Sequence, residues 1–202
     1  SAASDVYKRQ EGKLSVQFSS STEFSKAYMT PEFQSTYGNK KDMYESWGEK
    51  LATPSAYDPK DDFFNTGTNF INSLTLTTGT KQNQTFASVS STNSAGIVPN
   101  NSYDRLNFTI RNTATFFKDK LQLDLGASYV KQKDRNMVSQ GQYWNPVMAA
   151  YLFPRGENFE DIKTFERYDD SRKFPVQYWP VSEPTYASQN PYWTAYRNVA
   201  TN

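Results

Sequence analysis

The sequence contains no cysteine and no histidine among its 202 residues. The absence of cysteine excludes disulfides, zinc–thiolate sites and cysteine nucleophiles. The absence of histidine excludes Ser-His-Asp triads, histidine general bases and most transition-metal sites. Any catalysis would have to rest on carboxylate, lysine or tyrosine chemistry, and we expect no enzyme, no metal site and no cofactor.

The chain also lacks a charge excess and a long apolar run. Its formal net charge is +1 and its lysines are scattered, so we expect no nucleic-acid partner. No segment approaches the roughly 18 consecutive apolar residues of a transmembrane helix. Apolar content is low at 36%, whereas aromatic content is high at 16%. Such a composition suits binding surfaces and barrels with wet interiors.

The strongest pattern present is a long two-residue alternation between Tyr103 and Lys133. Successive side chains of a strand point to opposite sides of the sheet, so this alternation predicts a β-hairpin. The apolar rows are Leu106, Phe108, Ile110, Ala114 and Phe116 in the first arm, and Leu121, Leu123, Leu125, Ala127 and Tyr129 in the second. An even-numbered loop around Lys118 and Asp119 puts both rows on one side.

The opposite side of this hairpin is polar. With a two-residue loop, Arg111 lies opposite Gly126 and diagonal to Asp124, within side-chain reach. Arg105 shares this face, and we expect these charged side chains to face water and to set the electrostatics of the sheet surface.

Two environments explain a β-hairpin with one apolar and one polar face. A soluble β-sandwich buries one face of strands that usually run about 5 to 6 residues, and a carbohydrate-binding module of this kind would use exposed aromatics as its platform. A transmembrane β-barrel needs about 9 to 11 residues per crossing, with apolar side chains outward and aromatics at the membrane borders.

The rest of the chain predicts three more strands, near residues 13–19, 69–77 and 84–91. We therefore expect residues 11–135 to form about five transmembrane strands with one long outer loop, 21–65, and residues 136–202 to form an extracellular loop region. Short helices are expected at Asp42–Leu51 and Val147–Phe153.

The connections between the predicted strands alternate between long and short along the chain. Outer-membrane barrels have short periplasmic turns and longer outer loops, whereas a sandwich gives no reason for such alternation. We therefore predict an all-β fold, an antiparallel up-and-down meander that is a partial segment of a large transmembrane β-barrel.

The first ten residues, SAASDVYKRQ, show no period. They resemble translated sequencing-adapter read-through, so we expect residues 1–10 to be a non-native tail and the chain to be an internal piece of a longer protein. The alternative is an ordinary disordered N-terminal tail.

Several segments resemble SusC/RagA-type TonB-linked outer-membrane transporters. The run from Asp62 to Gly67, followed by Asn69 to Thr80, is similar to the F-x-T-G … N-x-L-x-x-x-G-G signature of that family, with Thr78 in place of a common glycine. Further similar segments are Phe86–Val89, Ala95–Val98, Tyr103–Phe108 and Asn190–Trp193. The resemblance covers most of residues 13–193 in the right order.

This resemblance implies a barrel of about 22 strands in the outer membrane of a Gram-negative cell. It implies a plug, absent from this chain, that contacts the TonB complex, and a SusD-like surface lipoprotein as partner. The expected function is import of oligosaccharides or peptides, with outer-membrane lipid around the strands. Arg105, Arg111 and Asp124 would then face the barrel lumen.

Aromatic pairs in the last third are the candidate ligand-binding residues, because aromatic side chains are good binding anchors. They are Tyr143, Trp144, Tyr178, Trp179, Tyr192 and Trp193. They could equally pack the loops together or meet the partner lipoprotein. The acidic pairs Asp61-Asp62, Glu160-Asp161 and Asp169-Asp170 suit solvated loops better than glycosidase or calcium sites.

Overall fold

The computed structural model describes residues 13–135, 139, 141–182 and 189–197. These residues divide into two units. The sheet unit takes residues 13–23, 69–94 and 103–133, and the loop unit takes residues 24–68, 95–102 and the described residues from 134 onward.

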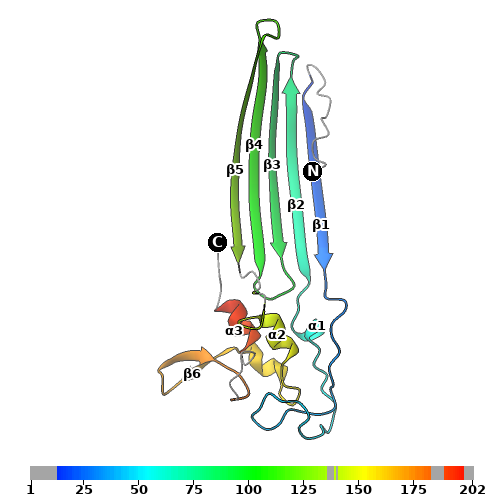
Figure 1. Ribbon diagram of the computed structural model, residues 1–202, viewed down its shortest axis with the longest axis vertical. Coiled ribbons are helices and arrows are strands. Elements are labelled where there is room, and N and C mark those ends of the chain that lie inside the picture. The colour runs from blue at the N-terminus through cyan, green and yellow to red at the C-terminus, as the bar shows by residue number, and fades with distance from the viewer. Residues whose placement is uncertain (1–12, 136–138, 140, 183–188, 198–202) are drawn as a thin grey trace. The chain divides into compact units, whose positions relative to one another are not determined.

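Five long strands form one antiparallel meander (Figure 1). They are β1 (Ser15–Ser25), β2 (Gly67–Gly79), β3 (Asn83–Ala95), β4 (Ser102–Phe116) and β5 (Leu121–Arg135). Each strand pairs with its neighbours in sequence, in the order β1-β2-β3-β4-β5. The prediction of an all-β, antiparallel up-and-down arrangement is therefore confirmed.

The turn between β4 and β5 has the predicted even register. The Lys120 N–H donates to the Phe117 carbonyl, which leaves Lys118 and Asp119 as the two central residues. Their φ angles are 54° and 66°, in the left-handed region that tight hairpin turns use to match strand twist. A Cβ placed on Gly126 would lie 4.0 Å from Cγ of Arg111, so these two residues face each other as predicted.

Two local predictions in the first long connection are wrong. The strand β1 continues to Ser25, so the connection begins later than residue 21, because Thr22 and Phe24 prolong the alternation past the serine run. Residues 42–51 form no helix. They belong to a hairpin-like turn closed by an isolated bridge between Tyr37 and Lys50, since Trp47-Gly48 supplies a turn in which Trp47 has a φ of 66°.

The loop unit contains short elements that begin at an Asx–Pro step. These are α1 (Pro59–Asp62), α2 (Pro146–Tyr151) and α3 (Pro191–Tyr196). In each, the preceding Asp or Asn side chain caps the first N–H groups, and proline occupies a position where an N–H is not needed. The helix expected at Val147–Phe153 is confirmed as α2.

The remaining elements are a 3-10 helix, η1 (Phe159–Lys163), and the two-stranded hairpin of β6 (Glu166–Asp169) and β7 (Phe174–Gln177). The core of the loop unit is largely aromatic. Its buried members are Phe63, Val98, Ala150, Phe153, Phe159 and Ile162.

Asn190 connects three segments at the centre of the loop unit. Its side chain is fully buried and donates from Nδ2 to the carbonyls of Ile162 (2.8 Å) and Tyr178 (2.9 Å). Its Oδ1 accepts from the N–H groups of Tyr192 and Trp193. Every donor and acceptor of this buried amide is satisfied, as burial of a polar group requires.

We predict that Asn190→Ala lowers the free energy of unfolding of the loop unit by about 3 kcal/mol, because two buried carbonyls and a helix cap lose their partner. Asn145→Ala is the matched control, since Asn145 is the N-cap of α2 and bonds only locally. The control should cost about 1 kcal/mol. Equal losses for both variants, measured by denaturant unfolding, would contradict the central role of Asn190.

The β6–β7 turn is closed by the carboxylate of Asp169. Its Oδ1 accepts from the Ser171 hydroxyl (2.6 Å) and from the N–H groups of Ser171 (2.9 Å) and Arg172 (3.1 Å). The hydroxyl bond and then the backbone bonds hold the pKa of this carboxyl below its usual range.

A lowered folded-state pKa makes the turn depend on pH. The stabilisation is fully present above the ordinary Asp pKa of about 3.9 and is lost as the pH falls through the lower folded value. We therefore expect the amide shifts of Ser171 and Arg172 to titrate with a midpoint below 3.9 in NMR spectra, and not to titrate there in Asp169→Asn. A midpoint at or above the ordinary value would show that these bonds do not persist in solution.

Candidate functional site

The most extensive surface feature is the apolar face of the five-stranded sheet. On β4, Leu106, Phe108 and Ile110 are 41%, 42% and 40% exposed. On β5, Leu123 and Leu125 are 45% and 59% exposed. Large contiguous apolar surfaces of this kind indicate contact with a protein partner or a membrane.

Side-chain hydrogen bonds between neighbouring strands identify the residues that share this face, because only side chains on the same side of a sheet can meet. Asn112 bonds Thr85, and Ser20 bonds Asn72. Alternation along each strand then assigns the others. The apolar face gains Val16 and Phe18 of β1, Phe70, Leu74 and Leu76 of β2, and Ala87 and Val89 of β3.

Five polar side chains on the apolar face are bonded within two groups. Asn112 Nδ2 donates to Asn83 Oδ1 (2.7 Å) and to Thr85 Oγ1 (2.9 Å). Ser20 Oγ donates to Asn72 Oδ1 at 2.7 Å. These groups thus have partners that do not depend on water.

The opposite face is mainly polar and carries an ion pair. The Arg111 guanidinium donates to both carboxylate oxygens of Asp124 in a bidentate arrangement. Arg105 is exposed and shares the parity of Arg111. The three residues predicted to face a lumen therefore lie on one face, and two of them are brought together. Ile71, Phe86 and Val130 are the apolar members of this face by the same alternation.

Three of the six aromatic candidates pack against the core of the loop unit. Tyr178, Trp179 and Tyr192 are partly buried against it. The Tyr192 hydroxyl donates to the Asp62 carbonyl at 3.3 Å, and burial raises the pKa of this phenol above its usual value. The Arg167 guanidinium lies 3.3 Å from the Tyr178 ring centroid. These contacts match the packing alternative for these residues.

Of the other three candidates, Tyr143 and Trp144 are exposed and Trp193 is half-buried. Tyr143 and Trp144 are 68% and 47% exposed, and the rings of Trp144 and Trp193 lie 6.2 Å apart. The fold brings residues from α3 and from the segment before α2 together, and the exposed Trp144 is the member of this pair with a ring open to a stacking ligand.

An open depression of about 430 Å³ lies beside α3. Its lining combines aromatic side chains with carboxylates and one lysine: Asp61, Asp62, Phe63, Phe64, Asn65, Pro99, Lys163, Phe165, Tyr192 and Tyr196. Phe165 and Tyr196 stack at 5.5 Å with an interplanar angle of 5°. The sequence analysis missed both residues, and the Asn190-Pro191 cap of α3 was the signal that could have placed Tyr196 on a helix.

The acidic pairs have structural partners. Asp62 Oδ2 accepts from the Asp58 N–H at 2.8 Å, and Glu160 pairs with Lys163. Among the described residues no group of three or more potential ligands is arranged to hold a metal ion. Across the same residues, no helix has both the length and the apolar character needed to cross a membrane.

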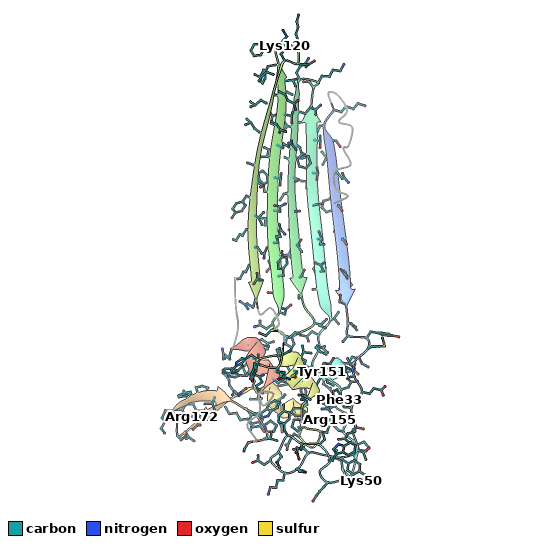
Figure 2. The ribbon with its side chains drawn as sticks, viewed as in Figure 1. Phe33, Lys50, Lys120, Tyr151, Arg155 and Arg172 are labelled. Atoms are coloured by element: carbon teal, nitrogen blue, oxygen red, sulfur yellow. The ribbon has the colours of Figure 1, made fainter. Side chains whose placement is uncertain are left out.

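A buried cation links two segments of the loop unit. Arg155, 8% exposed, donates to the carbonyls of Phe153 and Tyr151, and its guanidinium lies 5.1 Å from the Phe33 ring and 4.8 Å from the Tyr57 ring. Figure 2 labels Phe33, Tyr151 and Arg155 in this cluster. Desolvation lowers the pKa of Arg155 and raises that of Tyr57, so the cluster is held by ring contacts and carbonyls.

These features belong to a sheet with one apolar and one polar face and to a loop unit built on aromatic packing. No family model matches the sequence, and no curated protein gives a significant match.

Proposed function

We propose that this chain is part of the wall and outer loops of a TonB-dependent outer-membrane transporter. The observation that carries the proposal is the exposed apolar face of five long strands, on which Ser20 bonds Asn72 and Asn112 bonds Asn83 and Thr85. In lipid, every polar group must find its partner within the protein. The pairs Ser20–Asn72 and Asn83–Asn112 meet that requirement.

The dimensions of the strands support a membrane crossing. They contain 11 to 15 residues, more than the roughly 9 to 11 that a tilted crossing needs. The apolar row from Leu106 to Phe116 covers ten residue steps, or roughly 33 Å of strand, which is about 23 Å of membrane depth at a 45° tilt. A barrel presents an apolar band of about 25 Å.

The polar face suits the aqueous interior of such a barrel. A bidentate Arg–carboxylate pair such as Arg111–Asp124 keeps two charges on a water-lined wall without placing either in lipid. Arg105 adds a positive charge to the same wall. Their role there is electrostatic, acting on solutes that pass.

The sheet has two edge strands, β1 and β5. Open edges carry unpaired backbone groups and are not tolerated in hydrocarbon, so further strands must complete the wall. A closed barrel of about 22 strands would leave a lumen wide enough for a plug. The TonB complex, a SusD-like lipoprotein, and an oligosaccharide or peptide substrate are the partners this proposal names, in the Gram-negative outer membrane.

An arginine scan of β5 tests the orientation of the sheet. Leu123→Arg places a charge on the apolar face, and we expect a cost of about 2 to 4 kcal/mol, which is about a thirtyfold or larger loss of lipid-inserted chain. The measurement is the fraction that floats with phosphatidylcholine vesicles after refolding.

Gln122→Arg is the matched control, because residue 122 is the neighbour on the polar face. It should change the inserted fraction by less than about threefold, since that side chain faces water. Equal losses for the two variants would show that the sheet has no lipid-facing side.

Behaviour in water separates the proposal from a soluble carbohydrate-binding sandwich. We expect residues 11–202, expressed without detergent, to aggregate, because exposed apolar surface and unpaired edges drive association. Analytical ultracentrifugation and thermal melting provide the measurement. A soluble monomer with one cooperative transition would favour the sandwich and reject the barrel.

A further inference from the structure

Residues 36–51 of the loop unit form a small hairpin, here called the lid hairpin. Its two sides are joined by backbone hydrogen bonds from Gly38 N–H to Glu49 O (3.0 Å) and from Leu51 N–H to Thr36 O (3.0 Å). Within it only Gly38 is buried. A segment with so little buried surface contributes few apolar contacts of its own and belongs to the less stable part of a fold.

The base of the lid hairpin is firmly attached. The Phe33 ring lies 5.1 Å from the guanidinium of the buried Arg155 and stacks on Tyr151 with a centroid distance of 6.0 Å. Figure 2 labels these three residues. The Ser55 N–H donates to the Ser35 carbonyl at 2.8 Å, which ties the two ends of the hairpin together. The base is therefore a fixed point about which the rest could turn.

Polar contacts hold the tip at two places. Asn39 Oδ1 accepts from the Gly156 N–H at 2.9 Å. Asp42 Oδ1 accepts from the N–H and the hydroxyl of Ser182 at 2.9 and 3.0 Å. Exposed hydrogen bonds of this kind contribute modestly, because water replaces them when they break.

The tip of the lid hairpin covers Trp179, a side chain whose N–H lacks a hydrogen-bond partner among the described residues. The Tyr44 ring stacks on Trp179 at 6.1 Å with an interplanar angle of 20°, and Trp179 packs edge-on against Phe153. The indole Nε1 of Trp179 is buried and has no hydrogen-bond acceptor among the residues that the structure describes. A buried donor without an acceptor costs free energy in the closed form.

The turn of the lid hairpin itself contains two residues in the left-handed region. Asp42 and Trp47, both in the tip, have φ angles of 59° and 66°. Asp tolerates the left-handed region, but a bulky tryptophan there is disfavoured.

We propose that the lid hairpin is a hinged cover that opens about its base and exposes the face of the Trp179 ring. In the closed form Tyr44 occupies the position on Trp179 that a flat, ring-shaped ligand would take. This inference concerns the loop unit and stands whether or not the sheet spans a membrane.

The test uses the full chain refolded in detergent, with Trp47→Phe, Trp144→Phe and Trp193→Phe so that Trp179 is the one emitting tryptophan. Two variants weaken the closed form, one by a change in the lid hairpin and the other by a change in the residue that it contacts. Asp42→Ala removes the contact with Ser182. Gly156→Ala places a Cβ 2.5 Å from Asn39 Oδ1. The new methyl group therefore pushes Asn39, and with it the lid hairpin, away from residue 156.

Asp169→Ala is the matched control, because Asp169 makes the same pair of bonds to a serine N–H and hydroxyl in the β6–β7 turn. We expect acrylamide quenching of Trp179 to rise severalfold in both lid variants and to stay at the parent value in the control, since losing such contacts shifts an equilibrium by roughly tenfold. Unchanged quenching in both lid variants overturns the proposal.

A locked form keeps the proposal testable if a lid variant fails to fold. The chain has no cysteine, so Asp42→Cys/Ser182→Cys introduces a single reversible link between tip and body. Oxidation should lower Trp179 quenching below that of the reduced form, and reduction should restore it. Equal quenching in the oxidised and reduced forms would mean that the lid hairpin does not open.

Discussion

The register of β4 against β5 is the constraint on which the sheet depends. The turn at Lys118-Asp119 sets it, and the Arg111–Asp124 pair is its visible consequence. A slip of one residue would move every apolar side chain to the other face and would separate that ion pair. With this register the leucines of β5 continue the apolar row of β4, and the hydrogen bonds of Ser20, Asn72, Thr85 and Asn112 extend the same face across the sheet.

The loop unit is organised differently, by buried amides and ring contacts. The Asn190 side chain has all its donors and acceptors bonded, and it joins η1, the residue after β7, and α3. Arg155 lies between the rings of Phe33 and Tyr57 and donates to the carbonyls of Phe153 and Tyr151. Aromatic side chains fill such a core with few residues, because each buries a large area and offers polar edges to carbonyls. The weakly attached lid hairpin is the exception within this unit.

Predictions from the sequence succeeded where a strict period is present and failed where it is not. Alternation over more than ten residues identified β4 and β5 and their pairing, because side-chain direction in a strand is a local property. The end of β1, the hairpin in place of a helix at 42–51, and the β6–β7 hairpin were missed or misplaced. In these segments turn residues such as Trp47 and Lys173, both at positive φ, decide the path of the chain, and no periodic signal reveals them. The helix α3 had a usable signal in its Asn190-Pro191 step.

The sequence by itself determined the strand class, the division of each strand into an oily and a wet face, and the exclusion of cysteine and histidine chemistry, since these follow from residue type and spacing alone. The tertiary structure decided which aromatics remain exposed. Tyr178, Trp179 and Tyr192 are drawn into the core and Trp144 meets Trp193 because burial depends on contacts between segments far apart in the chain. A sequence pattern records how a side chain is directed along its own strand or helix, but it does not record what will lie on top of it.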